Sequence, residues 1–260
     1  MTSPPETQHL DMRGFKLPYR RAGSGPTVLF LHGAGGSSGW TPWHAKLAES
    51  VDLIAPEHPG WDSAETPDWL DHTTDLAFFY LDVMDKLDLH NVHLVGHSLG
   101  GWTAAEVAIR NTSRLASLTL LCAVGLNVEG MQAADGFMLP PEERAKSLVY
   151  APQHVEMMLQ RAMDPDLLDL NLKNSMIAAK LLWQPRNYNP QLRKWLRVSA
   201  VTDSRWHGGR GSLLRQRCAK WGIACSIILR RRRHVPKAGA RSTRWRLQAA
   251  FRPTELPMWH

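Results

Sequence analysis

The sequence predicts an α/β fold: a mostly parallel, doubly wound sheet flanked by helices, with a helical lid inserted into the core. Short apolar runs closed by glycine or proline alternate with helical patterns from about residue 27 to residue 123, which is typical of a parallel sheet with crossover helices. A long, mostly helical stretch then follows. With 260 residues, 43% of them hydrophobic and 21% charged, the chain is long and apolar enough to bury such a core.

Four apolar runs are expected to form buried strands, because each is short and continuously hydrophobic. They are residues 28–31, 52–55, 92–95 and 117–122. Three helices are expected around them, at 40–49, 73–87 and 99–110. The second helix is the best marked, since apolar residues recur at helical spacing, Thr73 or Thr74 can cap it, and Asp75 lies in its first turn.

Residues 127–196 have a different character, with many prolines and with six of the ten methionines between Met131 and Met176. We expect this insertion to be a lid over the carboxyl ends of the strands, where such sheets bind ligands. The core then comprises residues 1–126 and 197–260. The methionines admit two interpretations: they line an adaptable apolar pocket, or they pack the core of the insertion itself.

The motif Gly96-His97-Ser98-Leu99-Gly100 matches G-x-S-x-G between an expected strand and an expected helix. That context is typical of a nucleophile elbow, a sharp turn that raises the serine hydroxyl above the sheet. The positive end of the following helix favours a developing anion. We therefore predict Ser98 as a nucleophile.

Acyl transfer also needs an oxyanion hole, made of two N–H groups aimed at the charged oxygen. One donor is expected from Leu99, which follows the nucleophile, and the other from a loop after an earlier strand. The glycine-rich segment 30–36 supplies such a loop, and Ala34 is the predicted donor. The alternative is that this segment is a plain glycine-rich turn between a strand and a helix.

Together these motifs resemble the α/β-hydrolase family. The resemblance rests on His32-Gly33, on the loop at 55–63 and on the motif 96–101, and it covers roughly residues 9–200. It implies an eight-stranded sheet with a helical lid, and a serine nucleophile fits carboxylesterases as well as hydrolases that cleave C–C bonds in ring-fission products. We expect hydrolysis of a small, rather apolar carboxylic ester. The alternatives are C–C bond hydrolysis and an inactive hydrolase relic.

The same resemblance implies an orienting acid and a catalytic histidine after the lid. His234-Val235-Pro236 is similar to the family's H-x-P fragment, and 226–229 resembles the last strand but one. The expected acid position, near residue 210, holds Arg210, so Asp203 is a poor substitute. The weaker candidates for the base are His207 and His260.

Three other histidines lie close to these motifs. His97 adjoins Ser98 in the chain, so its side chain is badly placed to act as the base. His32 and His58 belong to loops that are structural in the family. We interpret all three as structural, or as supports for the site.

The charge of the chain is unevenly distributed. Residues 1–200 hold 17 Lys/Arg and 22 Asp/Glu, whereas residues 201–260 hold 14 Lys/Arg and two acids. Acidic residues become rare at the point where the strand pattern stops, near residue 200. A basic tail that binds nucleic acid or an anionic membrane is the rival interpretation, but the tail has neither a nucleic-acid fold signature nor a regular amphipathic helix. We therefore expect no specific nucleic-acid partner and no membrane partner, only a small apolar ester-like substrate.

The remaining features of the sequence set broad limits. The first residues lack the pattern of a signal peptide, no apolar run is long enough to span a bilayer, and the three cysteines form no metal or disulfide pattern. A cytoplasmic protein without a cofactor or a metal is therefore expected. The oligomeric state is left open.

Our hypothesis for the tail is that its reading frame has slipped near residue 200 and can return near the segment His234-Val235-Pro236. Twelve arginines and four of the eleven tryptophans lie in residues 201–260, as expected when GC-rich DNA is read out of frame. Translating the coding DNA with a one-base shift should then give a strand, a glycine and an aspartate soon after residue 200. If neither shift yields that pattern, the hypothesis is wrong.

Overall fold

The computed structural model describes most of the chain. The described ranges are 3–12, 14–126, 135–149, 151–198, 226–231 and 245–247. Asp203, His234, His207 and His260 lie outside these ranges, as does the first part of the predicted lid.

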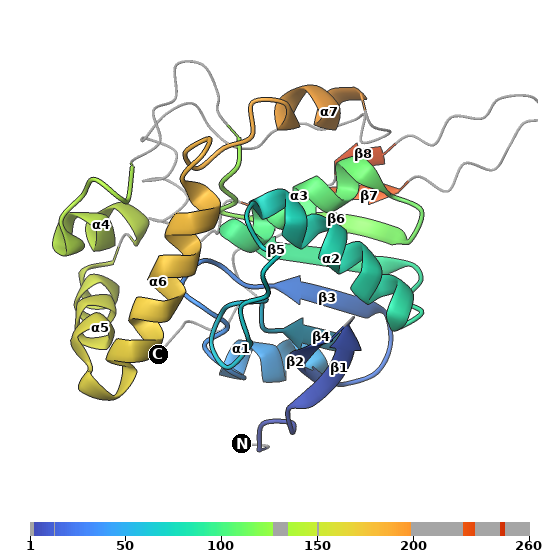
Figure 1. The fold of residues 1–260 in the computed structure, drawn as a ribbon. Coiled ribbons are helices and arrows are strands. Elements are labelled where there is room, and N and C mark those ends of the chain that lie inside the picture. Colours follow the sequence, from blue (N-terminus) through green and yellow to red (C-terminus); the bar gives the residue numbers. More distant parts are fainter. Residues whose placement is uncertain are drawn as a thin grey trace, which may run out of the picture.

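The fold is an α/β arrangement around one sheet, as predicted (Figure 1). Its strands are β1 (Gln8–Met12), β2 (Phe15–Ala22), β3 (Thr27–Leu31), β4 (Asp52–Pro56), β5 (Val92–His97), β6 (Leu115–Leu121), β7 (Ser226–Arg231) and β8 (Trp245–Leu247). They lie in the order β1-β2-β4-β3-β5-β6-β7-β8. The four strands from β4 to β6 in this order are parallel, and β1 and β2 are antiparallel at one edge. The four apolar runs identified in the sequence are these four parallel strands.

The helices begin and end close to the predicted limits. They are α1 (Pro42–Ala48), α2 (Thr73–Lys86), α3 (Leu99–Arg110), α4 (Pro141–Leu148), α5 (Pro152–Met163), the 3₁₀ turn η1 (Pro165–Leu167), α6 (Leu168–Leu182) and α7 (Leu192–Val198). None of the helices in the described ranges combines the length and hydrophobicity needed to cross a bilayer.

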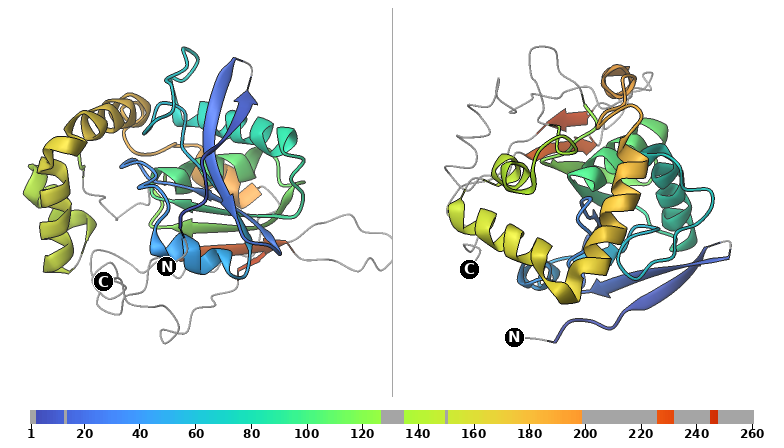
Figure 2. Two further views of the ribbon diagram at one scale, coloured as in Figure 1. Left: turned by 90° about the horizontal axis from the view of Figure 1, so that it is seen from below. Right: turned by 60° about the vertical axis from the view of Figure 1, so that its left-hand side comes forward.

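The two faces of the sheet are buried by different helices, because successive strand residues point to opposite sides. Leu29 and Leu31 of β3 belong to the main core beneath α2 and α3. Val28 and Phe30 point to the other face and pack with Trp43 of α1. Figure 2 shows α1 and the pair α2 and α3 on opposite sides of the sheet.

The far edge of the sheet departs from the parallel pattern. The predicted strand at 226–229 is part of β7, but β7 pairs antiparallel with β6: Ser226 lies opposite Leu121, and Arg230 lies opposite Ser117. The end of β7 therefore lies at the start of β6. Ser98, which follows β5, lies instead beside the end of β6, at the carboxyl ends of the parallel strands.

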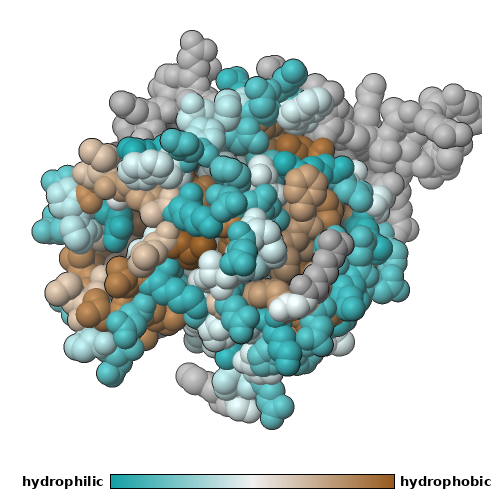
Figure 3. Space-filling model, in the orientation of Figure 1, coloured by the Kyte–Doolittle hydropathy of each residue, from teal (hydrophilic) through white to brown (hydrophobic). Residues whose placement is uncertain are grey.

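The helices that follow β6 differ in how they are buried. Ile177, Ala178 and Leu181 of α6 join the main core. Apolar side chains on the outer parts of α5 and α6 are exposed instead, and Figure 3 shows them gathered over these helices. Met163 is 79% and Met176 66% exposed, so these methionines do not pack a core of the insertion.

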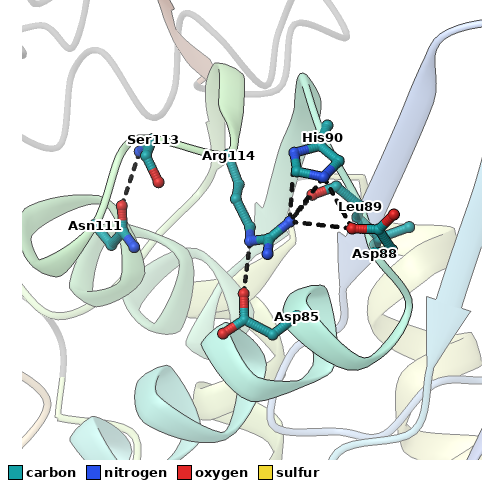
Figure 4. Close-up of polar contacts among 7 residues, drawn as sticks. All are labelled: Asp85, Asp88, Leu89, His90, Asn111, Ser113 and Arg114. Carbon is teal, nitrogen blue, oxygen red and sulfur yellow. Dashed lines mark hydrogen bonds and ion pairs between the residues drawn. The ribbon is translucent and has the colours of Figure 1, made fainter.

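One arginine fastens the turn that leads into β5 (Figure 4). Arg114 places Nε 2.6 Å from Oδ1 of Asp85 at the end of α2, and its Nη1 donates to the carbonyl oxygen of Leu89 at 2.9 Å. His90 Nε2 lies 2.9 Å from Oδ1 of Asp88 in the same turn. These contacts join the end of α2 and the turn before β5 to Arg114, which directly precedes β6.

The central strand β5 should be sensitive to loss of side-chain volume. Leu94 is fully buried in the main core, so Leu94→Ala should lower the free energy of unfolding by about 2–5 kcal/mol. Leu172→Ala on α6 is the matched control: its side chain is 58% exposed, so the change should stay within about 0.5 kcal/mol. Urea denaturation measures both, and equal effects would contradict the described packing.

Candidate active site

Ser98 lies at the sharp turn between β5 and α3. Its backbone adopts φ 53° and ψ −113°, a conformation that is rarely populated by residues with a side chain. Hydrogen bonds hold it there: its N–H donates to the carbonyl oxygen of Leu121 at 2.9 Å, and its own carbonyl accepts from the N–H groups of Trp102 at 3.1 Å and Val124 at 3.2 Å. The turn is therefore fixed from three sides.

The glycines of the motif are required by close backbone approaches. A Cβ on Gly96 would lie 2.2 Å from the carbonyl oxygen of Gly100. A Cβ on Gly100 would lie 2.2 Å from the carbonyl oxygen of Leu31, at the end of β3. The start of α3 thus rests directly on the ends of two strands.

The start of α3 also supplies a positive electrostatic potential, which favours a negative charge beside it. The first N–H groups of a helix have no partner within it, and the helix dipole adds positive potential there. Leu99 is the first residue of α3, and its side chain is fully buried. Its N–H group is therefore available beside Ser98.

The glycine-rich loop after β3 lies against the same turn. A Cβ built on Gly33 would be 3.1 Å from Cβ of Ser98 and 3.0 Å from Nδ1 of His97, so a side chain there would require these neighbours to shift by a few tenths of an ångström. The side chain of His97 is exposed. It lies by the backbone of Gly33, and no hydrogen bond joins it to Ser98 within the described ranges.

The carbonyl groups of this loop point into the protein. The Gly33 carbonyl accepts from Nδ1 of His32 at 2.8 Å and from the N–H of Gly36 at 3.1 Å. The Ala34 carbonyl accepts from Nε1 of Trp61 at 2.8 Å. A carbonyl and the next N–H point in opposite directions in a trans peptide, so the N–H of Ala34 is turned away from the buried His32 ring.

Two buried histidines and a tyrosine form a hydrogen-bond chain beneath the loop. His58 N–H donates to Nε2 of His32 at 2.8 Å, so the proton of His32 is on Nδ1. His58 Nε2 donates to the His32 carbonyl at 2.9 Å, which leaves Nδ1 of His58 to accept from the hydroxyl of Tyr80 at 2.6 Å. All of these groups are satisfied only when both rings are neutral.

Burial also favours the neutral forms of His32, His58 and Tyr80, because it disfavours charge. Loss of hydration lowers the pKa of His32 from 6.5 to about 4. It also lowers the pKa of His58, aided by the neighbouring His32, and raises the pKa of the Tyr80 hydroxyl. His32 and His58 therefore support the loop as neutral groups, in agreement with the interpretation made from the sequence.

The structure thus brings three predicted residues into one place: Ser98, Leu99 and Ala34. Asp203 and His234 lie outside the described residues. Sequence reasoning gave no role to Trp61, Asp62 or Asn174, which contact the loop from other segments. Trp61 and Asp62 lie in the loop 55–63, which carries part of the family resemblance, but no local signal predicts the pairing of Asp62 with Asn174, because the two are 112 positions apart. The described ranges contain no group of three or more His, Cys, Asp or Glu side chains arranged to hold a metal ion.

Comparison with known proteins identifies the family. Residues 26–196 match the alpha/beta hydrolase fold family. A curated protein of Mycobacterium tuberculosis with no described function is 32% identical over 151 residues, which cover 58% of this chain and 44% of that protein. The 2-hydroxy-6-oxo-6-phenylhexa-2,4-dienoate hydrolase of Comamonas testosteroni is 30% identical over 200 residues, which cover 73% of this chain and 66% of the enzyme.

A solved structure agrees with the fold. The 2-hydroxy-6-oxo-6-phenylhexa-2,4-dienoate hydrolase of Rhodococcus sp. strain RHA1 superposes with a TM-score of 0.54 at 20% identity, over 72% of this chain and 76% of the other. The chain spans about half to two thirds of the length of the two curated relatives named above. It belongs to the α/β-hydrolase fold family, and the curated proteins that it resembles include hydrolases.

The buried histidines predict a pH-dependent stability. His32 is neutral in the folded protein down to about pH 4 but takes up a proton near pH 6.5 when unfolded. The stability that it contributes is complete above pH 6.5 and is lost as the pH falls toward 4, by about 3 kcal/mol if it titrates alone. Urea denaturation at several pH values from 8 to 4.5 measures this loss.

A variant separates His32 from other titrating groups. His32→Asn should be less stable at pH 8, and its stability should fall less steeply between pH 6.5 and 4.5. Parallel curves for the two proteins would show that His32 does not titrate as its burial implies.

Proposed function

We propose that this chain is a serine hydrolase that cleaves a small, rather apolar carboxylic ester through an acyl-enzyme on Ser98. The observation that carries the proposal is the strained backbone of Ser98 between β5 and α3, fixed by three backbone hydrogen bonds. Strain of this kind persists only where the surrounding structure maintains it, and it is common at catalytic sites. The family supports a hydrolase, and the ester is our inference.

In the proposed reaction, Oγ of Ser98 attacks the carbonyl carbon of the ester while a base accepts the hydroxyl proton. The N–H groups of Leu99 and Ala34 hold the oxygen that becomes negative. The tetrahedral intermediate then collapses, the alkoxide leaves with the proton from the base, and a water molecule cleaves the acyl-enzyme by the same steps.

For the base and its orienting acid we propose His234 and Asp203. His234 is supported by its similarity to the family's H-x-P fragment. The direction of β7 argues against His234. β7 ends at Arg231 beside the start of β6, whereas Ser98 lies at the carboxyl ends of the parallel strands. Losing only the orienting acid of such a triad reduces the rate by about four orders of magnitude without abolishing the site.

A second candidate function is hydrolysis of a C–C bond in a ring-fission product. The Comamonas testosteroni relative, whose name gives a 2-hydroxy-6-oxo dienoate as its substrate, favours it. The same serine and the same oxyanion donors would serve both reactions. The third alternative is an inactive hydrolase relic with a disrupted C-terminal region. In all three cases we propose residues 127–196 as a helical lid.

Hydrolysis of a short-chain p-nitrophenyl ester and of a 2-hydroxy-6-oxo dienoate tests these functions. Ser98→Ala should reduce turnover by about 10⁴-fold or more, because the nucleophile is lost. Ser147→Ala on α4 removes a hydroxyl that hydrogen-bonds only a local carbonyl, and it should leave turnover unchanged. The preferred substrate decides between ester and C–C hydrolysis.

Labelling with a fluorophosphonate provides an assay that does not require the right substrate. Wild type should be labelled and Ser98→Ala should not. Labelling that persists in His234→Ala would show that another group activates the serine. A folded wild type without labelling or turnover would identify the chain as a relic.

A further inference from the structure

We propose that Asp62 and Asn174 are positioning residues that couple helix α6 to the loop carrying the oxyanion donor Ala34. The proposal rests on the proposed function, because it gives that loop its task. Asp62 follows β4 and Asn174 lies in the middle of α6, so the pair joins two distant segments. Figure 1 shows α6 running along the side of the sheet toward which β3 points.

The side chain of Asn174 binds Asp62 at two points, one on its side chain and one on its backbone. Asn174 Nδ2 donates to Oδ1 of Asp62 at 2.9 Å, and the backbone N–H of Asp62 donates to Oδ1 of Asn174 at 2.9 Å. Asn174 is only 3% exposed, so its amide has little access to water. A buried polar side chain without its partner is costly, which makes this pairing specific.

The second oxygen of Asp62 holds the loop itself. Oδ2 accepts from the backbone N–H of Ser37 at 2.6 Å. A Cβ on Gly36, whose φ is +99°, would lie 2.4 Å from Oδ1 of Asp62 and 2.6 Å from Nδ2 of Asn174, so the loop packs directly on the pair. The same Nδ2 lies 3.4 Å from the Gly35 carbonyl.

The neighbouring residues of the pair strengthen the connection. Trp61 donates to the Ala34 carbonyl, so positions 61 and 62 together hold both ends of the segment 34–37. Lys173, next to Asn174 on α6, donates to the backbone carbonyls of Asp62 at 2.8 Å and Ala64 at 2.7 Å. Asp62 itself has a left-handed backbone, with φ 48°.

Movement of α6 is therefore transmitted to the donor. The pair is a connection between the helical segment and the loop, and its effect falls on the chemical step rather than on substrate affinity. A shift of about 1 Å at such a donor can cost about 100-fold in rate. An oxyanion donor that is removed altogether costs about 10²- to 10³-fold.

Exchanging the two side chains provides the sharpest test. Asp62→Asn has one acceptor oxygen for two N–H donors, and Asn174→Asp sets two carboxylates against each other. Each single variant should lower kcat and the fluorophosphonate labelling rate of Ser98 by about 10- to 100-fold with little change in KM. The double variant Asp62→Asn with Asn174→Asp again matches every donor within the pair, and most of the rate should return.

Two matched controls make the same chemical changes elsewhere. Asn171→Asp alters an amide one turn away on α6 that bonds only the Arg161 carbonyl, and Asp68→Asn alters an exposed carboxylate. Both should label at the wild-type rate. The proposal is overturned if Asp62→Asn labels like wild type, or if the double variant is no faster than the single variants.

Hydrogen exchange separates this proposal from the proposed function. The amide of Ser37 should exchange faster in Asp62→Asn and Asn174→Asp and recover protection in the double variant, whether or not Ser98 reacts. If wild type is not labelled but exchange follows this pattern, the proposed function fails and the coupling stands. Unchanged exchange at Ser37 in the single variants overturns the coupling itself.

Discussion

The close approach of α3 to the ends of β3 and β5 is the constraint on which the site depends. The helix can begin where it does only because Gly96 and Gly100 have no side chains. Their close approach leaves Ser98, between them, in a backbone conformation that is rarely populated by residues with a side chain. The same packing places the free N–H groups of the first helical turn beside the serine. The strained turn at Ser98 and the positive end of the helix beside it are thus consequences of one steric fit.

The glycine-rich loop is held in a different way, by hydrogen bonds to its carbonyl groups. Neutral His32 and His58 bind it from beneath, and Trp61 binds it from the side. Because every anchored carbonyl points inward, the N–H groups on the other side of those peptides are left for a ligand. Burial keeps both histidines uncharged, so their role is structural although histidine is a common catalytic residue.

The two halves of a hydrolase site are unequally represented in this chain. The groups proposed to bind a developing anion come from residues 26–196, where the match to the family lies. The groups proposed for proton transfer come from the basic segment after residue 200, whose composition differs from that of the rest. β7 lies in that segment and runs antiparallel to β6. The end of β7 therefore lies at the amino ends of the parallel strands, away from Ser98.

The sequence by itself determined the parallel strands, the first three helices and the sharp turn at Ser98. Apolar periodicity and glycine spacing are local patterns, so they can be recognised without knowledge of the fold. It also predicted Ser98, Leu99 and Ala34 as members of one site, since all three lie in segments that directly follow a strand. Only the tertiary structure decided the direction of β7 and the pairing of Asp62 with Asn174. Both depend on contacts between segments far apart in the chain, and no pattern in neighbouring residues records such contacts.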